Sequence, residues 1–483
     1  MNPKTLLLIL LFLFTLCAIG LYGQFVPDDT FIHIGYAKDI AAGKGYSFAG
    51  NATYGSTSPL WPLLLALFSF AHLGNPLTAQ IVSLLFSLGT LVLLFKTARC
   101  RFDPVTALAA VALCVSNSYI LRWSFTGMES TASCFFLLVL TYLLFREFDH
   151  TAKSGYYLLA GLSPLLRPEF YLFLLVFFLF LILTKKMSRI PTKVFLACLP
   201  PLFWNVFAYL YYGTIVPTTF SIKAGGALFS TEWETIVRSA KLIVSANPIE
   251  LLVFTASAIM IGVAHFRRKR INSRNLFQSE YFLLFLWALL FYLYYLAKDV
   301  TVLSRYALVL LPVIILVTLH VLKVVCDKWD LSETRRRQAM ASIVTVSLAV
   351  HIIFTVMVVK PDADSFTNGF LREYKTIAEE LSRQERPGNA VAVSDVGVVG
   401  VYSGMKICDF VGLVDKDRFR FASNHDYFVS KKPQFLIHRN EFALSEIQDS
   451  TFSLQPIYSG SISSLGINRQ VPVQVNVYHV FWR

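Results

Sequence analysis

The sequence predicts a mostly α-helical, polytopic membrane protein with about 11 transmembrane helices and a small C-terminal α/β domain. The prediction depends on the composition, on the length of the apolar segments, and on a change of pattern near residue 360. Of the 483 residues, 55% are hydrophobic and 15% are charged, and the mean hydropathy is +0.57. Soluble domains are typically about 45–50% apolar and about 25% charged. The composition therefore excludes an ordinary soluble protein.

Eleven segments are candidates for membrane-spanning helices, which need about 20 mostly apolar residues. They are 5–22, 77–95, 104–120, 129–145, 155–168, 169–184, 194–212, 247–265, 279–296, 305–322 and 340–358. The first is longer than the apolar region of a signal peptide, about 7–15 residues, and no A-x-A-like site follows it, so we expect an uncleaved helix. Segment 59–73 is apolar but short, with Pro59 and Pro62 in its first turn, and we expect it to lie at the membrane surface.

The distribution of basic residues predicts the orientation of the helices. With Met1 inside the cell, the inner segments carry 20 Lys and Arg, whereas the outer loops carry nine. Loops rich in Lys and Arg stay on the cytoplasmic side. We therefore expect a multi-pass protein of the inner (plasma) membrane, whose first outer loop, 23–76, and residues 360–483 face the periplasm or the exterior. Treating segment 59–73 as a span would reverse every later loop and contradict the bias.

Residues 360–483 differ from the rest of the chain in charge and in periodicity. They hold 14 basic and 14 acidic residues, so the whole net charge of +13 lies in residues 1–359. A helical pattern over 366–384 precedes the strand-like stretches "NAVAVSD", "KPQFLIHR" and "VPVQVNVYHVFW". The sequence thus predicts a transmembrane domain over 1–359 and a soluble α/β domain over 360–483. The basic excess fits contact with anionic lipid, and no nucleic-acid partner is predicted.

The stretch "FVPDDTFIHIGYAKDIAAGKGYSF", residues 25–48, presents two adjacent carboxylates directly after the first apolar segment. Pro27 precedes them, and Asp28 or Asp29 can cap the amides of a helix that starts here. Asp29 and His33 then share one face of an amphipathic helix at the membrane interface. Because capping needs only one acid, we expect at least one of the pair to be functional.

Ionisable residues near the ends of the predicted spans gather on the outer side, and such residues are costly in a membrane and usually functional. They are Arg122, Glu129, Arg167, Glu169, Lys223, Lys298, Asp299, Arg305 and Tyr306. Structural alternatives exist: Arg167 and Glu169 can form an ion pair, and Arg305 can reach lipid head groups. Glu129 can cap a helix, and Lys223 can lie on the surface. Together with the acid pair, the set suits a site in which cations hold a lipid phosphate and an aspartate deprotonates a hydroxyl.

Cysteine and histidine patterns indicate neither disulfides nor a metal site. Of the seven cysteines, Cys408 alone lies in a predicted outer segment, so no disulfide framework is predicted. No C-x-x-C or His-rich motif appears. A divalent cation is compatible with the chemistry, but the sequence does not indicate a cofactor.

The stretch "DDTFIHIGYAKDIAAGKGYSFAGNATYGSTSPLWPLLLAL", residues 28–67, resembles the first outer loop of the GT-C-fold glycosyltransferases that use polyprenyl-phosphate sugars. It is most similar to the branch that contains the terminal arabinofuranosyltransferases of the mycobacterial cell wall. The shared features are the double acid, Tyr36-Ala37, Gly43-x-Gly45 and the run from Tyr54 to Trp61. The later stretches "FTGMES", "LLRPEF", "YYGTIVPTTFSIK", "SRYALVLLP" and "VSDVGVVGVYSGMKICDFVGLVD" also resemble that branch.

The resemblance implies a membrane glycosyltransferase that moves a sugar from polyprenyl phosphate to a hydroxyl acceptor on the outer face, with inversion. The acceptor is a glycan, a lipid or a protein. An acid of the first outer loop is implied as the general base; Asp28 matches by position, and Asp29 is expected to support it. The candidate substrate-binding residues are His33, Tyr36, Arg122, Glu129, Arg167, Glu169, Lys223, Arg305 and Tyr306, with Arg305 and Lys223 as the phosphate clamp.

Two other classes of protein remain open at this point. A transporter or flippase of lipid-linked glycans predicts charges through the middle of the membrane and broken helices in repeated halves. Neither feature is evident in the sequence, and such a protein does not need a large outer domain. An envelope assembly factor leaves the outer cluster of acids and bases without a role.

Overall fold

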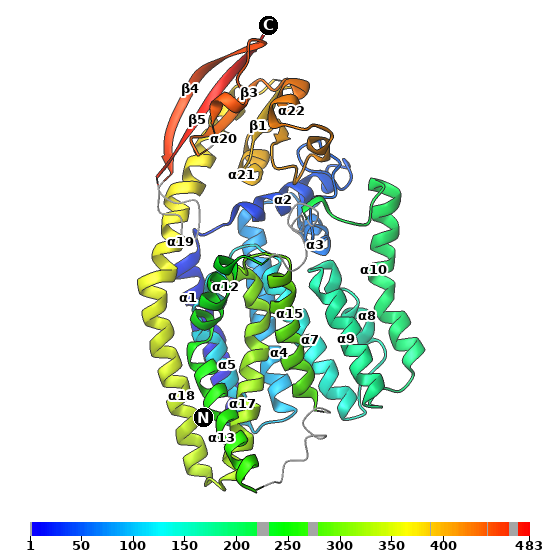
Figure 1. Cartoon of the computed structure of the whole chain (residues 1–483), viewed down its shortest axis with the longest axis vertical. Coiled ribbons are helices and arrows are strands. Elements are labelled where there is room, and N and C mark those ends of the chain that lie inside the picture. Colours follow the sequence, from blue (N-terminus) through cyan, green and yellow to red (C-terminus); the bar gives the residue numbers. More distant parts are fainter. Residues whose placement is uncertain (1, 220–230, 269–278, 387, 442, 463–471) are drawn as a thin grey trace.

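The computed structural model describes residues 2–219, 231–268, 279–386, 388–441, 443–462 and 472–483. These residues form an elongated helical bundle that carries a small sheet at one end (Figure 1). The C-terminus lies at the sheet, and the N-terminus lies toward the opposite end of the bundle.

Seven helices in the described part of the chain are long and apolar enough to cross a membrane. They are α1 (Pro3–Tyr22), α4 (Pro76–Arg99), α7 (Ser130–Phe148), α10 (Ile190–Tyr212), α15 (Glu280–Ala297), the run of α16, η2 and α17 (Ser304–Lys328), and the run from α18 to α20 (Glu333–Arg383). Two further helices, α12 (Trp233–Ala246) and α13 (Pro248–Arg268), pass the same test as a pair that is bent by 92°. The prediction of a mostly helical, multi-pass membrane protein is confirmed.

Three of the expected spans form shorter elements. Two are the apolar helices α5 (Pro104–Ser116) and α9 (Glu169–Leu183), and the third is α8 (Tyr156–Ala160) followed by the single turn η1 (Ser163–Leu165). The expectation of a spanning helix over 155–168 is therefore wrong. Gly161 ends α8 so close to α10 that a Cβ atom there would lie 2.3 Å from the Ala197 carbonyl oxygen. Pro164 then has no amide hydrogen with which to continue a helix.

Two short helices follow α1 before the next long helix. They are α2 (Asp28–Ala41) and the ten-residue α3 (Leu60–Ser69), which packs against α2. Ten residues span about 15 Å as a helix, too little to cross a hydrocarbon core of about 30 Å. The expectation that 59–73 does not span the membrane therefore agrees with the length of α3.

The end of the chain forms a five-stranded sheet in the order β2-β1-β3-β5-β4. Strands β1 (Ala390–Val393), β2 (Lys406–Asp409) and β3 (Phe435–Arg439) are parallel, and β5 (Val473–Trp482) is antiparallel to β3 and β4 (Phe452–Ile462). Three helices alternate with these strands in the chain: α20 (Arg372–Arg383) precedes β1, α21 (Val396–Tyr402) follows it, and α22 (Asn424–Lys431) precedes β3. We call residues 390–482 the outer domain, and residues 23–76 the first outer loop, after the side of the membrane that the sequence predicts for them. Its Val-rich strands β1 and β5 match the stretches that the sequence marks as strands.

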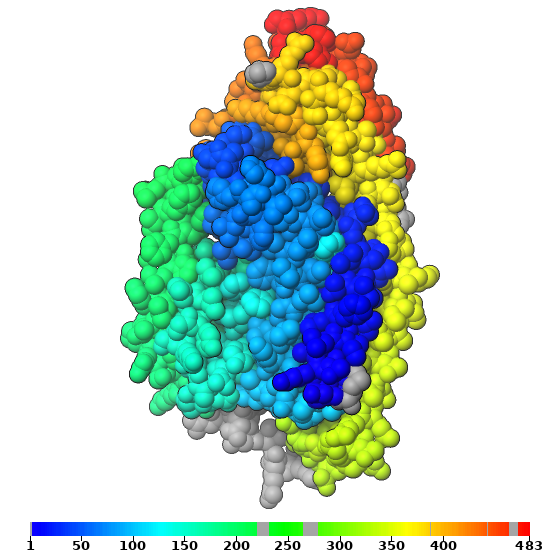
Figure 2. All heavy atoms as spheres, turned by 180° about the vertical axis from the view of Figure 1, so that it is seen from behind, coloured from blue at the N-terminus to red at the C-terminus, as the bar shows by residue number. Residues whose placement is uncertain are grey.

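The helical run from α18 to α20 leads from the bundle to the sheet without a break (Figure 1). Two π-helical turns, Thr355–Val359 and Thr367–Leu371, lie within it. The predicted domain boundary at 359/360 falls inside this continuous helix. Figure 2 shows the opposite side of the molecule, where α1 runs beside the same helical run.

A second hydrophobic core joins the first outer loop to the outer domain. Phe31, Tyr36 and Phe48 of the loop pack in one cluster with residues of β1 and α21, among them Val391 and Val398. The loop and the outer domain are therefore packed as one unit, although more than 300 residues separate them in the sequence.

Candidate active site

A cavity of about 350 Å³ lies where α2, the loop before α3, and the neighbouring ends of α7, α9, α15 and α16 (Ser304–Ala307) meet the outer domain. Its lining residues are Asp29, Ile32, His33, Gly55, Ser56, Thr57, Ser58, Met128, Glu129, Arg167, Pro168, Glu169, Thr219, Tyr294, Tyr295, Lys298, Val300, Arg305, Tyr306, Leu413 and Val414. Seven of the eleven site residues that the sequence singles out therefore lie around one cavity.

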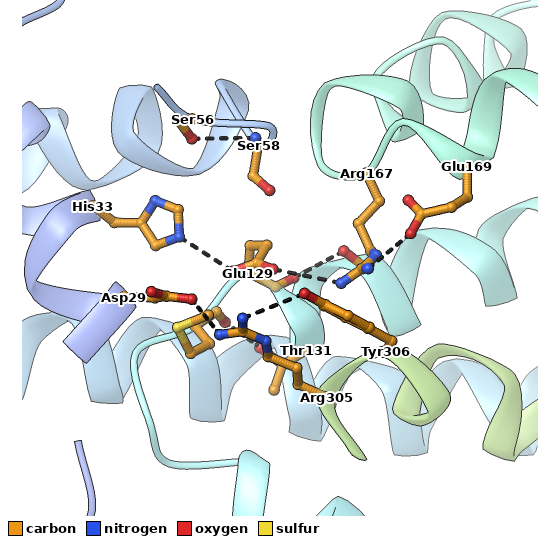
Figure 3. A network of polar contacts seen from close by, with 12 residues as sticks. Asp29, His33, Ser56, Ser58, Glu129, Thr131, Arg167, Glu169, Arg305 and Tyr306 are labelled. Atoms are coloured by element: carbon orange, nitrogen blue, oxygen red, sulfur yellow. Dashed lines mark hydrogen bonds and ion pairs between the residues drawn. The ribbon is translucent and has the colours of Figure 1, made fainter. Parts of the chain in front are cut away.

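Asp29 stands at the cavity from the first turn of α2. Its carboxylate pairs with the Arg305 guanidinium, and its side chain is 39% exposed. Arg305 also donates to the Tyr306 hydroxyl at 3.4 Å. Figure 3 shows Asp29 and His33 side by side along α2, as the helical spacing predicts. The exposed fraction makes Asp29 accessible to a molecule that enters the cavity.

Glu129 lies at the centre of the polar network in Figure 3. One carboxylate oxygen lies 3.2 Å from His33 Nε2, and the other lies 3.6 Å from Arg167 Nη1. Arg167 also pairs with Glu169 at 2.8 Å and donates to the Tyr295 hydroxyl at 2.9 Å. Glu129, Arg167 and Glu169 are almost fully buried, so the predicted ion pair exists and forms part of the cavity wall.

Tyr306 provides an aromatic surface between the two arginines. The Arg167 and Arg305 guanidinium carbons lie 4.5 Å and 5.2 Å from the centroid of its ring. Cations over an aromatic face are stabilised by the ring quadrupole. Tyr306 therefore contacts both guanidinium groups at the wall of the cavity.

Lys298 differs from the two arginines of the cavity. The lining contains three carboxylates, Asp29, Glu129 and Glu169, and both arginines pair with them. The Lys298 ammonium makes no ion pair or side-chain hydrogen bond with any described residue. Because no described carboxylate pairs with Lys298, its positive charge is available to a ligand in the cavity.

Several buried polar atoms of the lining lack a hydrogen-bond partner within the described ranges. They are His33 Nδ1, Arg167 Nε, Glu169 Oε2, Thr219 Oγ1 and Arg305 Nε. Buried polar atoms in folded proteins are nearly always hydrogen-bonded to protein or ordered water. Their concentration around one cavity favours a polar ligand or bound water there.

Asp28 does not line the cavity. Its two carboxylate oxygens accept hydrogen bonds from the amides of Gly397 at 3.0 Å and Val398 at 2.8 Å, in the first turn of α21. Burial and the nearby Asp395 carboxylate raise the pKa of Asp28 to about 7, although the amide hydrogen bonds oppose the shift. Asp28 therefore contacts α21 of the outer domain, whereas the adjacent Asp29 contacts Arg305 at the cavity.

Three other candidates lie elsewhere or outside the described residues. Tyr36 is buried in the second core and donates its hydroxyl to the Thr53 carbonyl at 2.8 Å. Arg122 is buried, lies over the Phe25 ring and pairs with Asp362 at 3.3 Å, which ties α6 (Ser118–Trp123) to α19 (Lys360–Phe366). Lys223 lies outside the described residues, so its predicted role in a phosphate clamp stays a prediction.

Sequence reasoning missed several lining residues. Leu413 and Val414 come from the outer domain, and Ser56, Thr57 and Ser58 come from the loop before α3. The stretches "GSTS" and "FVGLVD" are part of the resemblance, but their residue types alone do not point to a binding site. Among the described residues, no group of three or more His, Cys, Asp or Glu side chains is arranged to hold a metal ion.

Comparisons with known proteins bear on the fold. Residues 368–478 match a family described as a domain of unknown function, DUF8728. No curated protein sequence matches the chain. The crystal structure of ArnT from Cupriavidus metallidurans bound to undecaprenyl phosphate is similar over 97% of both chains, with a TM-score of 0.64 and 10% identity.

The oligosaccharyltransferase of Archaeoglobus fulgidus in its apo form is similar over 90% of this chain and 69% of that protein, with a TM-score of 0.59 and 12% identity. The same archaeal protein, AglB, in complex with an inhibitory peptide and a dolichol-phosphate, has a TM-score of 0.55 and 10% identity over 90% and 69% of the two chains. This chain has the GT-C fold. The arabinofuranosyltransferase-like branch is not among these structures, so that finer resemblance stays a prediction.

Proposed function

We propose that this GT-C-fold protein is a membrane glycosyltransferase that moves a sugar from a polyprenyl-phosphate donor to a hydroxyl acceptor on the outer face. The observation that carries the proposal is a single cavity that combines an accessible carboxylate, Asp29, with an ammonium that has no described partner, Lys298. The similar ArnT structure contains undecaprenyl phosphate, and the similar AglB structure contains a dolichol-phosphate and a peptide. The acceptor class, whether glycan, lipid or protein, stays open.

Within this proposal, Asp29 is the general base. A base must come within hydrogen-bond reach of the hydroxyl it deprotonates, and geometry is decided before pKa. Asp29 lines the cavity, whereas both oxygens of Asp28 are engaged by amides of α21. The raised pKa of Asp28 alone would suit a base, but its position does not.

The proposed step is a single displacement at the anomeric carbon of the donor sugar. The acceptor hydroxyl gives its proton to Asp29 while its oxygen bonds to the anomeric carbon. The bond from that carbon to the phosphate oxygen breaks, and its electron pair leaves with the polyprenyl phosphate. Attack opposite the leaving phosphate inverts the anomeric centre. Cations placed where charge develops stabilise the departing phosphate, and Lys298 is suited to this task.

Replacing Lys298 with alanine should weaken binding of undecaprenyl phosphate by at least about tenfold, because one charge-assisted contact contributes about 1.5–3 kcal/mol. The measurement is a titration of the purified protein with undecaprenyl phosphate. Lys241→Ala is the matched control, because Lys241 lies on α12 and outside the cavity lining. Equal affinities of wild type and Lys298→Ala would contradict the assignment.

The proposed sidedness can be tested with cysteine labelling on intact cells. Ser450 is exposed in the outer domain, and Lys153 is exposed in a loop predicted to be cytoplasmic. We expect Ser450→Cys to react with a membrane-impermeant thiol reagent on intact cells and Lys153→Cys to react only after lysis, because of the 20-to-9 bias in basic residues. The reverse pattern would place the cavity on the cytoplasmic side.

The experiment that tests the function has two stages. Mass spectrometry of envelope glycans, lipids and proteins from cells with and without this chain identifies the missing sugar linkage. The purified protein is then supplied with that sugar on a synthetic polyprenyl phosphate and with the identified acceptor. Transfer with inversion supports the proposal. Movement of the intact lipid-linked sugar between leaflets without transfer would instead indicate a flippase.

A further inference from the structure

The structure assigns to Asp28 a positioning role: it fastens the first turn of α2 to α21 of the outer domain and so holds the neighbouring Asp29 at the cavity. The inference rests on the proposed function, in which Asp29 accepts the proton. It adds that the outer domain is a structural part of the active site rather than an appended module.

The contact between Asp28 and α21 is short, bidentate and closely fitted. The carboxylate accepts hydrogen bonds from the amides of Gly397 and Val398. These two residues follow Asp28 by 369 and 370 positions in the chain. A Cβ atom at Gly397 would lie 2.2 Å from the Asp28 carbonyl oxygen and 2.7 Å from its Oδ1. Since Cβ atoms do not approach this closely, the contact requires glycine at position 397.

A second anchor lies on the other side of Asp29 in the sequence. The buried Thr30 hydroxyl donates to the Thr126 carbonyl at 2.9 Å, in the loop that leads to Glu129. Asp29 therefore lies between Asp28, which is hydrogen-bonded to the outer domain, and Thr30, which is hydrogen-bonded to the helical bundle. Because successive helical residues point about 100° apart, fixing both neighbours fixes the direction of the Asp29 side chain.

The rest of the first outer loop is fastened to the outer domain in the same way. Asn51 donates to the Ile407 carbonyl at 2.8 Å, and the Lys416 amide donates to the Thr53 hydroxyl at 3.2 Å. Gly55 approaches the Leu413 carbonyl so closely that a Cβ atom would lie 2.2 Å from it. Gly55 and Leu413 both line the cavity, so the contacts between the first outer loop and the outer domain extend to the candidate site.

The test compares substitutions on both sides of the contact. Asp28→Ala and Gly397→Ala should each lower kcat by about 10–10²-fold with little change in the KM for the donor, because a misplacement of about 1 Å can cost that much. The double variant should be no slower than the slower single variant, because both remove the same contact. Gly155→Ala is the control, since nothing lies within 4 Å of a Cβ atom there.

Asparagine at position 28 separates positioning from proton transfer. Its amide oxygen can accept a hydrogen bond from one of the two α21 amides, as a cap does, but its NH2 group cannot accept from the other, and the side chain cannot take a proton from the acceptor hydroxyl. We expect Asp28→Asn to lose less of the transfer rate than Asp28→Ala and to keep one of the Gly397 and Val398 amides protected from hydrogen exchange. Both amides should exchange faster in Asp28→Ala. A loss of transfer in Asp28→Asn as large as that in Asp28→Ala, with one amide still protected, would make Asp28 the base and overturn the inference.

A readout that needs no activity keeps this test separate from the proposed function. The paired substitutions Asp29→Cys and Arg305→Cys should be joined by a short bifunctional thiol reagent, because the native side chains are in contact. Adding Gly397→Ala should reduce the yield of this cross-link, whereas adding Gly155→Ala should not. An unchanged yield with Gly397→Ala would overturn the positioning role. Failure of the wild type to transfer any sugar would overturn the proposed function alone.

Discussion

Replacing Asp29 with asparagine is expected to lower the rate of sugar transfer by about 10²–10⁴-fold, the usual contribution of a general base. Asparagine has the same shape and can still accept a hydrogen bond from Arg305, but it cannot take the proton of the acceptor. Binding of undecaprenyl phosphate should stay close to wild type, and the loss of the ion pair with the largely buried Arg305 should lower the thermal stability measurably without unfolding the protein. The measurement is transfer of a labelled sugar from a synthetic polyprenyl phosphate by purified protein.

Asp364→Asn is the matched control for this experiment. Asp364 is a half-exposed carboxylate of α19 that pairs with Lys360 one turn away and does not line the cavity. Its substitution should leave the rate unchanged. If Asp29→Asn transfers sugar near the wild-type rate, the general base must be sought elsewhere in the cavity, with Glu129 as the next candidate.

Replacing Arg167 with methionine is expected to lower the free energy of unfolding by about 3–5 kcal/mol, because it leaves buried charge without its partner. Glu129 and Glu169 both pair with Arg167, and all three side chains are at most 8% exposed. The measurement is unfolding of the purified protein in detergent. Adding Glu169→Gln should recover part of the loss, because it removes one of the two stranded carboxylates.

Arg238→Met is the control for the stability measurement. Arg238 pairs with Glu234 on the surface of α12, and both side chains are at least 60% exposed. Exposed pairs of this kind contribute about 0.3–0.5 kcal/mol. Equal stability of Arg167→Met and the wild type would mean that solvent or a bound cation compensates the two glutamates.

The cavity combines features that the sequence predicts separately. Helical spacing places Asp29 and His33 on one face, and the outer ends of several apolar segments carry Glu129, Arg167 and Arg305. These predictions succeed because local periodicity and the position of a charge at a helix end are properties of short stretches. The spacing says nothing about how far apart two such ends lie once the helices pack.

Segment 155–168 shows the limit of reading spans from hydropathy. Its apolar residues match the composition of a membrane helix, but the helix α8 ends at Ala160 and only a single turn, η1, follows it. The break depends on close packing of Gly161 against the Ala197 carbonyl in α10 and on Pro164. Hydropathy measures the preference of a segment for an apolar environment, and neighbouring helices can satisfy that preference as well as lipid can.

Composition and local periodicity are enough to predict the membrane class of this protein, the positions of most of its long helices, the strand-rich C-terminal region and the helix that starts at the acid pair. The packing of distant segments is needed to show that Asp29 faces the cavity while Asp28 faces α21, that Arg122 pairs with Asp362, and that Lys298 has no described ionic partner. These features escape local patterns because hydrogen bonds and ion pairs act over about 3–4 Å, between residues that the chain separates by hundreds of positions.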